Sequence, residues 1–205
     1  MPRFIFIILS LLVSSLCRAQ TSTNIRSNLY QCEGCAAVYE RDHQYLTWQS
    51  IIPTPNEPGE TLVLRGIVYK IDGKTPAENV IIYSYQTNAE GLYANGTTET
   101  QWSRRHGNMR GWVITGKDGR YEFQTIKPAP YPNTNLPAHV HFTILETGHP
   151  PYWIDDIVFD GEVGVTAAYK KSMTNKGGNG IVMLQRTANS KLLVVRDIIL
   201  ERHTN

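Results

Sequence analysis

From residue 62 onward the chain alternates between apolar and polar positions with a period of two. This alternation is typical of strands that bury one face. It is clear at residues 62–70 and again at 120–126, where Tyr121 and Phe123 alternate with charged or polar neighbours. Further stretches rich in β-branched and aromatic residues follow at 79–86, 138–145, 154–159, 180–185 and 192–200. About eight such strands, without strong amphipathic helices, predict an all-β fold: an antiparallel β-sandwich.

The chain before residue 61 has a different pattern. Residues 20–28 are polar, and Pro53, Pro55 and Pro58 make 51–59 an extended connector. We therefore expect residues 20–60 to form an N-terminal extension and linker that packs on the domain. Residues 61–205 are expected to form one sandwich domain, since a chain of this size can bury a sizeable core.

The first residues have the pattern of an export signal. Arg3 precedes an apolar run at 4–13, and Cys17 and Ala19 suit the −3 and −1 positions of a cleavage site before Gln20. Residues 1–19 are therefore predicted to be a signal peptide of an exported protein, periplasmic or extracellular. Lipid anchoring at Cys17 is less favoured, because the preceding Leu16 is large. The apolar run is too short to span a bilayer, and no other segment is long and apolar enough.

Charge and cysteine content narrow the classes of partner. The chain has 20 Lys and Arg against 18 Asp and Glu, and losing Arg3 and Arg18 with the signal would leave 18 against 18. A neutral chain argues against a nucleic-acid or anionic-membrane partner.

Cys32 and Cys35 form a CxxC pair without a second pair to complete a zinc site, so we expect a disulfide in an exported protein.

His139 and His141 are the most informative pair in the sequence. Residues i and i+2 of a strand share one face, so the two imidazoles can bind one metal ion. Tyr131 lies in a proline-framed turn just upstream, and Tyr93 lies in another turn-like stretch. Alone, a His-x-His pattern is more often structural or exposed, and a copper or zinc site is an alternative. Together with two phenols, which are hard anionic donors when deprotonated, the set favours trivalent iron.

The chain also resembles the intradiol ring-cleavage dioxygenases, the superfamily of catechol and protocatechuate dioxygenases. The matching motifs occur in the family's order over roughly residues 62–160. They are Gly66-Ile67-Val68, the segments 85–93 and 118–128, Arg110-Gly111, and the run from Tyr131 to Pro137-Ala138-His139-Val140-His141-Phe142.

The resemblance implies a non-haem Fe(III) bound by Tyr93, Tyr131, His139 and His141. It also implies that Tyr131 is an axial ligand that a chelating catechol displaces and that accepts a substrate proton. The activity implied is insertion of both atoms of O2 into a catechol-type ring, with intradiol cleavage to a muconate-type product. Family members often oligomerise, so a homo-oligomer is allowed, although the sequence identifies no interface.

Two positions depart from the family's pattern. Leu136 stands where ring-cleaving members often carry an arginine, and Asp156 aligns roughly with a glutamine that assists the oxygen chemistry. The expected electrostatics around the metal therefore differ. The alternative function is a non-catalytic, transthyretin-like β-sandwich binding module that could still bind metal. Asp155 and Asp156 could instead be exposed turn residues, and the other histidines, His106 among them, are expected to be surface or hydrogen-bonded side chains.

Overall fold

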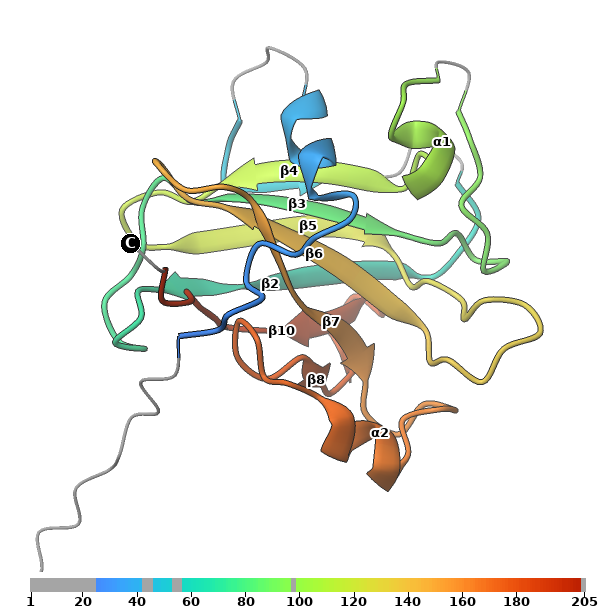
Figure 1. The fold of residues 1–205 in the computed structure, drawn as a ribbon. Coiled ribbons are helices and arrows are strands. Elements are labelled where there is room, and N and C mark those ends of the chain that lie inside the picture. The colour runs from blue at the N-terminus through green and yellow to red at the C-terminus, as the bar shows by residue number, and fades with distance from the viewer. Residues whose placement is uncertain (1–24, 42–45, 53–56, 97–98, 204–205) are drawn as a thin grey trace, which may run out of the picture.

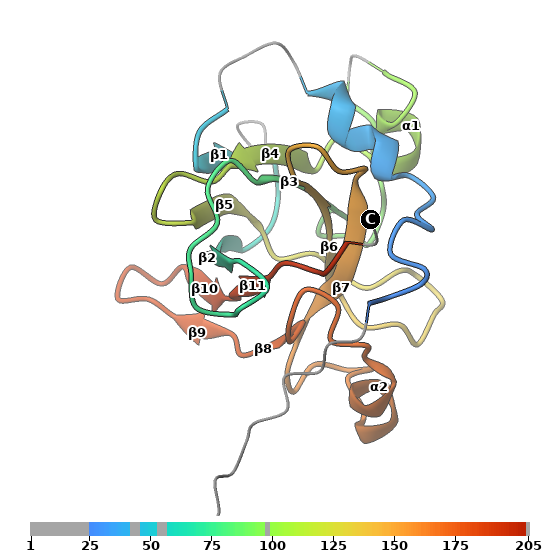
Figure 2. The ribbon, with the colours of Figure 1, turned by 60° about the vertical axis from the view of Figure 1, so that its left-hand side comes forward.

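The computed structural model describes residues 25–41, 46–52, 57–96, 99–203 of the chain. The predicted signal peptide, including Cys17, lies outside these residues. Two β-sheets face each other and enclose the core (Figures 1 and 2). Among the described residues, no helix is both long enough and apolar enough to cross a membrane.

The first sheet contains the strands on either side of β2. In spatial order they are β1 (Gln49–Ile51), β5 (Arg120–Ile126), β2 (Thr61–Tyr69), β10 (Leu192–Val195) and β9 (Gln185–Arg186), with β11 (Ile198–Ile199) also pairing with β2. The second sheet is ordered β4 (Arg110–Ile114), β3 (Ile81–Gln86), β6 (His139–Leu145), β7 (Tyr152–Phe159) and β8 (Ile181–Val182). The helices are short: the 3-10 helix η1 (Cys35–Glu40), α1 (Ser103–His106) and α2 (Ala167–Ser172).

The predicted β-sandwich is confirmed, and its central pairs β2–β5, β3–β4, β3–β6 and β6–β7 are antiparallel. Both sheets are mixed, however, because β1 runs parallel to β5, β10 and β11 run parallel to β2, and β8 runs parallel to β7. Residues 192–200 form two strands rather than one. They part at residues 196 and 197, where the Asp197 carboxylate accepts a hydrogen bond from the Ile67 amide at 3.0 Å.

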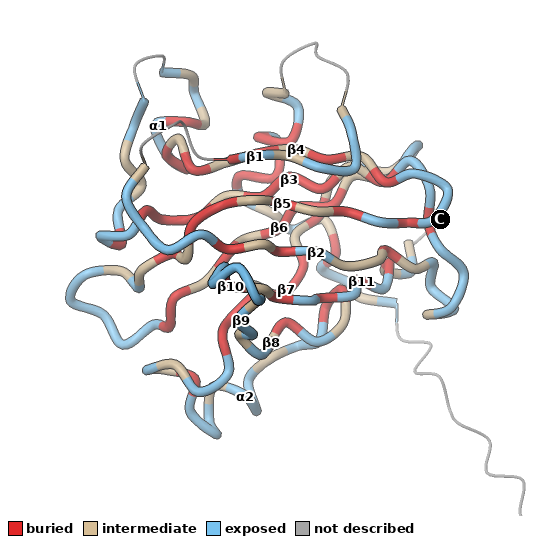
Figure 3. Tube along the Cα trace, turned by 180° about the vertical axis from the view of Figure 1, so that it is seen from behind, coloured by how far each residue is buried: buried red, intermediate tan, exposed pale blue. Residues whose placement is uncertain are grey.

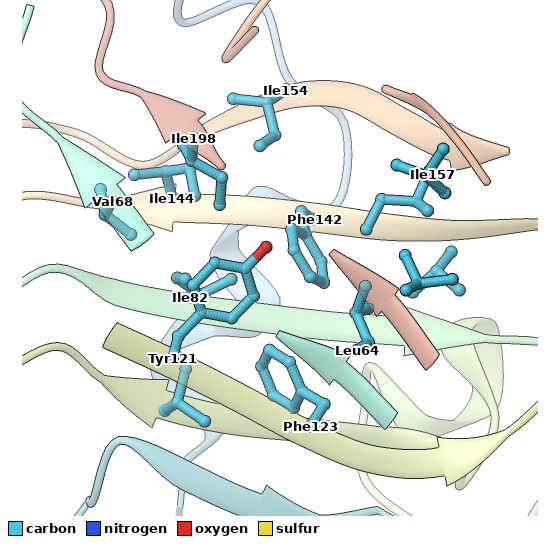
Figure 4. Packing of buried hydrophobic residues seen from close by; sticks show 14 of the residues in the cluster. Leu64, Val68, Ile82, Tyr121, Phe123, Phe142, Ile144, Ile154, Ile157 and Ile198 are labelled. Carbon is cyan, nitrogen blue, oxygen red and sulfur yellow. The ribbon is translucent and has the colours of Figure 1, made fainter. Parts of the chain in front are cut away.

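Alternating side chains from both sheets make the core (Figure 4). Phe123 and Leu64 come from the first sheet and meet Phe142 of the second, and all three are buried. The Tyr121 phenol donates to the Arg196 carbonyl at 2.6 Å, so its polar end is satisfied. Gly66 allows Arg196, just after β10, to come this close, because a Cβ at residue 66 would lie 1.9 Å from that carbonyl oxygen. Seen from behind, the buried residues follow the strands, while the loops and α2 are largely exposed (Figure 3).

The N-terminal segment crosses the outer face of the second sheet (Figures 1 and 2). The Trp153 indole donates to the Gln31 carbonyl at 3.2 Å, and the Trp112 indole donates to the Val38 carbonyl at 3.0 Å. Cys32 and Cys35 form the expected disulfide within this segment. Further along, β1 adds an edge strand to the first sheet, so the N-terminal extension contributes to the sandwich itself.

Replacing Phe123 with alanine should lower the free energy of unfolding by about 3–5 kcal/mol, because the change leaves a cavity between the two sheets. Chemical denaturation of the purified protein measures this. Val195→Ala is the matched control: Val195 is 49% exposed, and its truncation should cost no more than about 0.5 kcal/mol. Equal losses for the two variants would contradict the assignment of Phe123 to the core.

Candidate metal centre

Four side chains that the sequence singles out lie together at one end of the second sheet. The phenol oxygens of Tyr93 and Tyr131 are 2.6 Å apart. His139 Nε2 is 3.1 Å from the Tyr131 oxygen, and His141 Nε2 is 3.0 Å from the Tyr93 oxygen and 3.4 Å from that of Tyr131. Two oxygens and two nitrogens from three separate segments therefore converge on one small volume.

Strand β6 aims both imidazoles at this point. Along the strand, Val140 and Phe142 are buried in the core, while His139 and His141 are half-buried on the outer face. This is the period of two expected of a strand with one covered face. The two rings are 4.6 Å apart and nearly perpendicular, so each presents an edge to the shared volume.

A tight turn after β3 brings Tyr93 to the same place. The Asn88 side-chain carbonyl accepts from the amides of Glu90 and Leu92, both at 3.0 Å. Gly91 has a φ of 80°, and a Cβ there would lie 2.1 Å from the Pro130 carbonyl oxygen. Only glycine therefore lets this turn lie against the segment that carries Tyr131.

The segment that carries Tyr131 is held against the same turn. The Ala129 amide donates to the Asn88 carbonyl at 3.1 Å, and the Thr87 hydroxyl donates to the Ala129 carbonyl at 2.7 Å. These bonds fix the two phenol-bearing loops relative to each other. The Tyr93–Tyr131 contact therefore follows from backbone docking and does not depend on the phenols alone.

The protonation of both imidazoles follows from their outer partners. His139 Nδ1 lies 2.7 Å from the Pro137 carbonyl, which can only accept, so this nitrogen carries the proton. His141 Nδ1 lies 2.7 Å from an Asp156 carboxylate oxygen. Burial alone would raise the pKa of Asp156, but the neighbouring His141 outweighs it and holds that pKa below its ordinary value. The carboxylate is therefore an acceptor for the His141 Nδ1–H, and the Nε2 atoms of both imidazoles face the phenols.

Asp156 reaches His141 because β7 is irregular beside it. Val140 pairs with Ile157 and Phe142 pairs with Ile154, so two residues of β7 oppose the single residue His141. Such a bulge turns one side chain away from its regular direction. Asp155 is buried and Asp156 is half-buried, and both lie within the strand. The alternative that they are exposed turn residues is therefore wrong.

A buried arginine supports this bulge. Arg196 reaches across from the end of β10, and its Nη1 donates to the Asp155 carbonyl at 2.6 Å. The Asp155 carboxylate accepts from the Thr174 hydroxyl, and its amide donates to the Lys176 carbonyl at 2.9 Å. The backbone at the bulge is thus fixed from both sides, and this in turn fixes Asp156 behind His141.

Tyr85 and His106 continue the site outward and were not singled out by the sequence. The Tyr85 ring stacks on His141 with centroids 4.4 Å apart, and His106 stacks on the other face of Tyr85 at 3.9 Å. Tyr85 is the direct cross-strand neighbour of His141, which strand pairing could have indicated. His106 comes from α1 and has no sequence signal; its Nδ1 pairs with the Tyr83 phenol at 2.9 Å.

Burial shifts the titration of the cluster. Burial raises the pKa of the Tyr93 phenol, and its hydrogen bond with Tyr131 raises it further. Burial also raises the pKa of Tyr131. Burial lowers the pKa of His139, and the charge of His141 lowers it further. Without a metal ion the phenols are therefore protonated and His139 is neutral at pH 7.

A different trio is also close enough to hold an ion. One ligand atom each of His139, His141 and Asp156 lies within 4.8 Å of the others. Binding through Asp156 would compete with its hydrogen bond to His141 Nδ1, whereas the two Nε2 atoms and two phenol oxygens need no such change. The geometry therefore favours the phenol–imidazole set, with Asp156 orienting His141.

Comparison with known proteins identifies the family. The profile of the family described as Dioxygenase matches residues 38–193, most of the chain. The catechol 1,2-dioxygenase of Acinetobacter baylyi is 28% identical over 134 residues, which cover 52% of this chain and 42% of that protein. The protocatechuate 3,4-dioxygenase beta chain of Burkholderia cepacia is 30% identical over 110 residues, covering 51% and 46%. The chain belongs to the intradiol ring-cleavage dioxygenase superfamily, and it spans less than half the length of these relatives.

Solved structures share the fold. The catechol 1,2-dioxygenase from Pseudomonas arvilla C-1 superimposes with a TM-score of 0.58 at 21% identity, covering 79% of this chain and 60% of that one. The dioxygenase domain of a dioxygenase–carbohydrate-binding protein fusion from Streptomyces sp. SirexAA-E gives a TM-score of 0.55 at 23% identity, covering 75% and 87%. At these identities the likeness concerns the fold alone.

His106→Gln should remove part of the protein's sensitivity to acid. Burial, followed by the charge of His141, lowers the pKa of His106 to about 4 from 6.5. Between these values the unfolded chain binds a proton that the folded protein does not, so wild-type stability is complete above pH 6.5 and falls as the pH drops towards 4. The slope is about 1 kcal/mol per pH unit. Denaturation curves at several pH values should show it in the difference between wild type and variant, and a pH-independent difference would contradict it.

Proposed function

We propose that the protein is a non-haem Fe(III) dioxygenase that cleaves a catechol-type ring between its two hydroxyl-bearing carbons, using O2. Tyr93, Tyr131, His139 and His141 would hold the iron. The observation that carries the proposal is the convergence of two phenol oxygens and two Nε2 atoms, which are joined by contacts of 2.6 to 3.4 Å. Membership of the intradiol superfamily supports the reaction class.

The donor set fits a trivalent ion in charge as well as geometry. His139 carries its proton on Nδ1 and so offers Nε2 to a metal ion, and Asp156 accepts at His141 Nδ1, so Nε2 is the free ligand atom of that ring as well. Two phenolates and two neutral imidazoles leave a net charge of +1 with Fe(III). A ferric ion would lower the pKa values of both phenols, opposing the effect of burial.

In the proposed reaction, each residue of the site would have a separate role. Fe(III), when bound, supplies Lewis acidity that draws electron density from a chelated catechol and activates its ring towards O2. Tyr131 would give up its place to the substrate, and its oxygen would accept one of the catechol's hydroxyl protons. His139 and His141 keep their orientation through Pro137 and Asp156. Tyr85 would cover one face of His141 and limit the approach of water.

We further propose that the protein is exported. Two features support this: the apolar run at residues 4–13, with a signal-type cleavage site before Gln20, and the disulfide between Cys32 and Cys35. Disulfides persist chiefly in oxidising compartments.

The visible spectrum and iron content of the purified protein test the main proposal. We expect about one iron per chain and a tyrosinate-to-iron charge-transfer band that shifts when catechol is added under nitrogen. Admitting O2 should then yield a muconate-type product. A protein that stays colourless and iron-free after reconstitution would overturn the proposal, and a zinc- or copper-loaded protein without a tyrosinate-to-metal band would favour a simple His-x-His site.

Tyr131→Phe separates the enzyme from a non-catalytic binding module. The variant keeps the aromatic ring and the loop docking through Ala129, so it should fold. We expect loss of ring cleavage and a changed charge-transfer band with the thermal midpoint retained. Unchanged behaviour in every assay would support the module.

Asp156→Asn should weaken iron binding about 10- to 100-fold, because it replaces the anionic partner of His141 Nδ1. Competition with a ferric chelator measures the affinity, and the charge-transfer band reports the change at the ligand. Asp118→Asn is the control: this carboxylate is exposed, and its ion-pair partner among the described residues is Arg120. Equal iron affinity in wild type and Asp156→Asn would show that Asp156 does not support the site.

A further inference from the structure

We propose that an uncharged groove beside the candidate metal centre binds a neutral, apolar substituent on the catechol ring, so that the preferred substrates are alkyl-type catechols rather than carboxylated ones. This inference rests on the proposed function, and it adds the class of substrate.

The groove lies between the loop that joins Tyr131 to His139 and the region of α2; in Figure 1 these are the yellow loop and the orange helix. Its volume is about 620 Å³, ample for a substituted ring. Pro130, Thr134, Asn135 and Leu136 form one wall. The other is formed by Val163, Gly164, Thr166, Ala168, Tyr169 and Ser172.

One wall of this groove belongs to the segment that begins at Tyr131 and ends at His139. Pro130 immediately precedes Tyr131. Gly164 lies against the opposite loop so closely that a Cβ would be 2.8 Å from the Asn135 carbonyl oxygen and 3.0 Å from the Pro137 nitrogen. The carbonyl of the same Pro137 orients His139. A ring chelated at the phenol–imidazole cluster would therefore direct a substituent towards this groove.

The charges around the groove argue against a carboxylate. Of its lining residues that the structure describes, none is Lys, Arg, His, Asp or Glu. The nearby Lys127 pairs with Glu162 at 2.7 Å, and Lys170 pairs with Asp160. Leu136, at the position where ring-cleaving relatives often carry arginine, brings an apolar side chain instead. A substrate carboxylate held here would lose water without gaining a cation.

The apolar side chains of the groove are open to a ligand. Leu136 is 51% exposed and Val163 is 91% exposed. An alkyl group lying between them would remove apolar surface from water on both sides. A four-carbon group that is half covered would favour binding by about tenfold, because two covered carbons contribute about 0.8 kcal/mol each.

The test compares three probes on the iron-loaded full chain: catechol, 4-tert-butylcatechol and 3,4-dihydroxybenzoate. We expect kcat/KM for 4-tert-butylcatechol to exceed that for 3,4-dihydroxybenzoate by at least tenfold. Val163→Lys should lower this ratio about tenfold, because it adds a cation and removes apolar surface. Val195→Lys is the matched control, because Val195 is a half-exposed valine on β10 outside the groove, and it should leave the ratio unchanged.

Calorimetric titration of the same probes under nitrogen keeps the groove testable if no catechol is cleaved. In that case the proposed function fails, while the ratio of dissociation constants still reports on the groove. A ratio that favours the carboxylated probe, or one that Val163→Lys and Val195→Lys change equally, would overturn the inference.

Discussion

The hydrogen bond between His141 and Asp156 is the constraint on which the candidate site depends. It keeps a proton on His141 Nδ1 and turns the Nε2 atom towards Tyr93 and Tyr131. The bond exists only because β7 places two residues opposite one residue of β6. Arg196 braces that irregularity from the other sheet, so the orientation of one imidazole depends on contacts that cross the sandwich.

On the outer face of the second sheet, an aromatic stack and the N-terminal segment also support His141. His141, Tyr85 and His106 form a continuous stack, and the N-terminal segment covers its outer end. Gly34 lies so close to His106 that a Cβ there would be 3.0 Å from Nε2. The segment is held by the Cys32–Cys35 disulfide and by an ion pair between Glu40 and Arg110 at 2.7 Å. The N-terminal segment, which looks like a peripheral extension in the sequence, therefore covers the stack that ends at His141, a candidate metal ligand.

The electrostatics of the site differ from the pattern that the family resemblance predicts at residues 136 and 156. Leu136 supplies no cation, and the carboxylate of Asp156 interacts with His141 rather than with the open groove. The nearby lysines form ion pairs with carboxylates: Lys127 pairs with Glu162, and Lys170 pairs with Asp160. This arrangement agrees with the proposed neutral ring substituent, next to a cluster whose two phenolates would neutralise two of the three charges of a ferric ion.

The sandwich and the shared face of His139 and His141 could be predicted from the sequence, because both follow from alternation along single strands. Tyr93 and Tyr131 were added to the set through the family resemblance, since no local pattern relates them to the histidines. β1 and β4 were not predicted, since each is short and gains its stability from pairing with a neighbour rather than from its own pattern. Only the tertiary structure decided the roles of Asp156, Arg196 and His106. Their contacts depend on strand register, a bulge and packing between sheets, which bring together residues that no spacing along the chain relates.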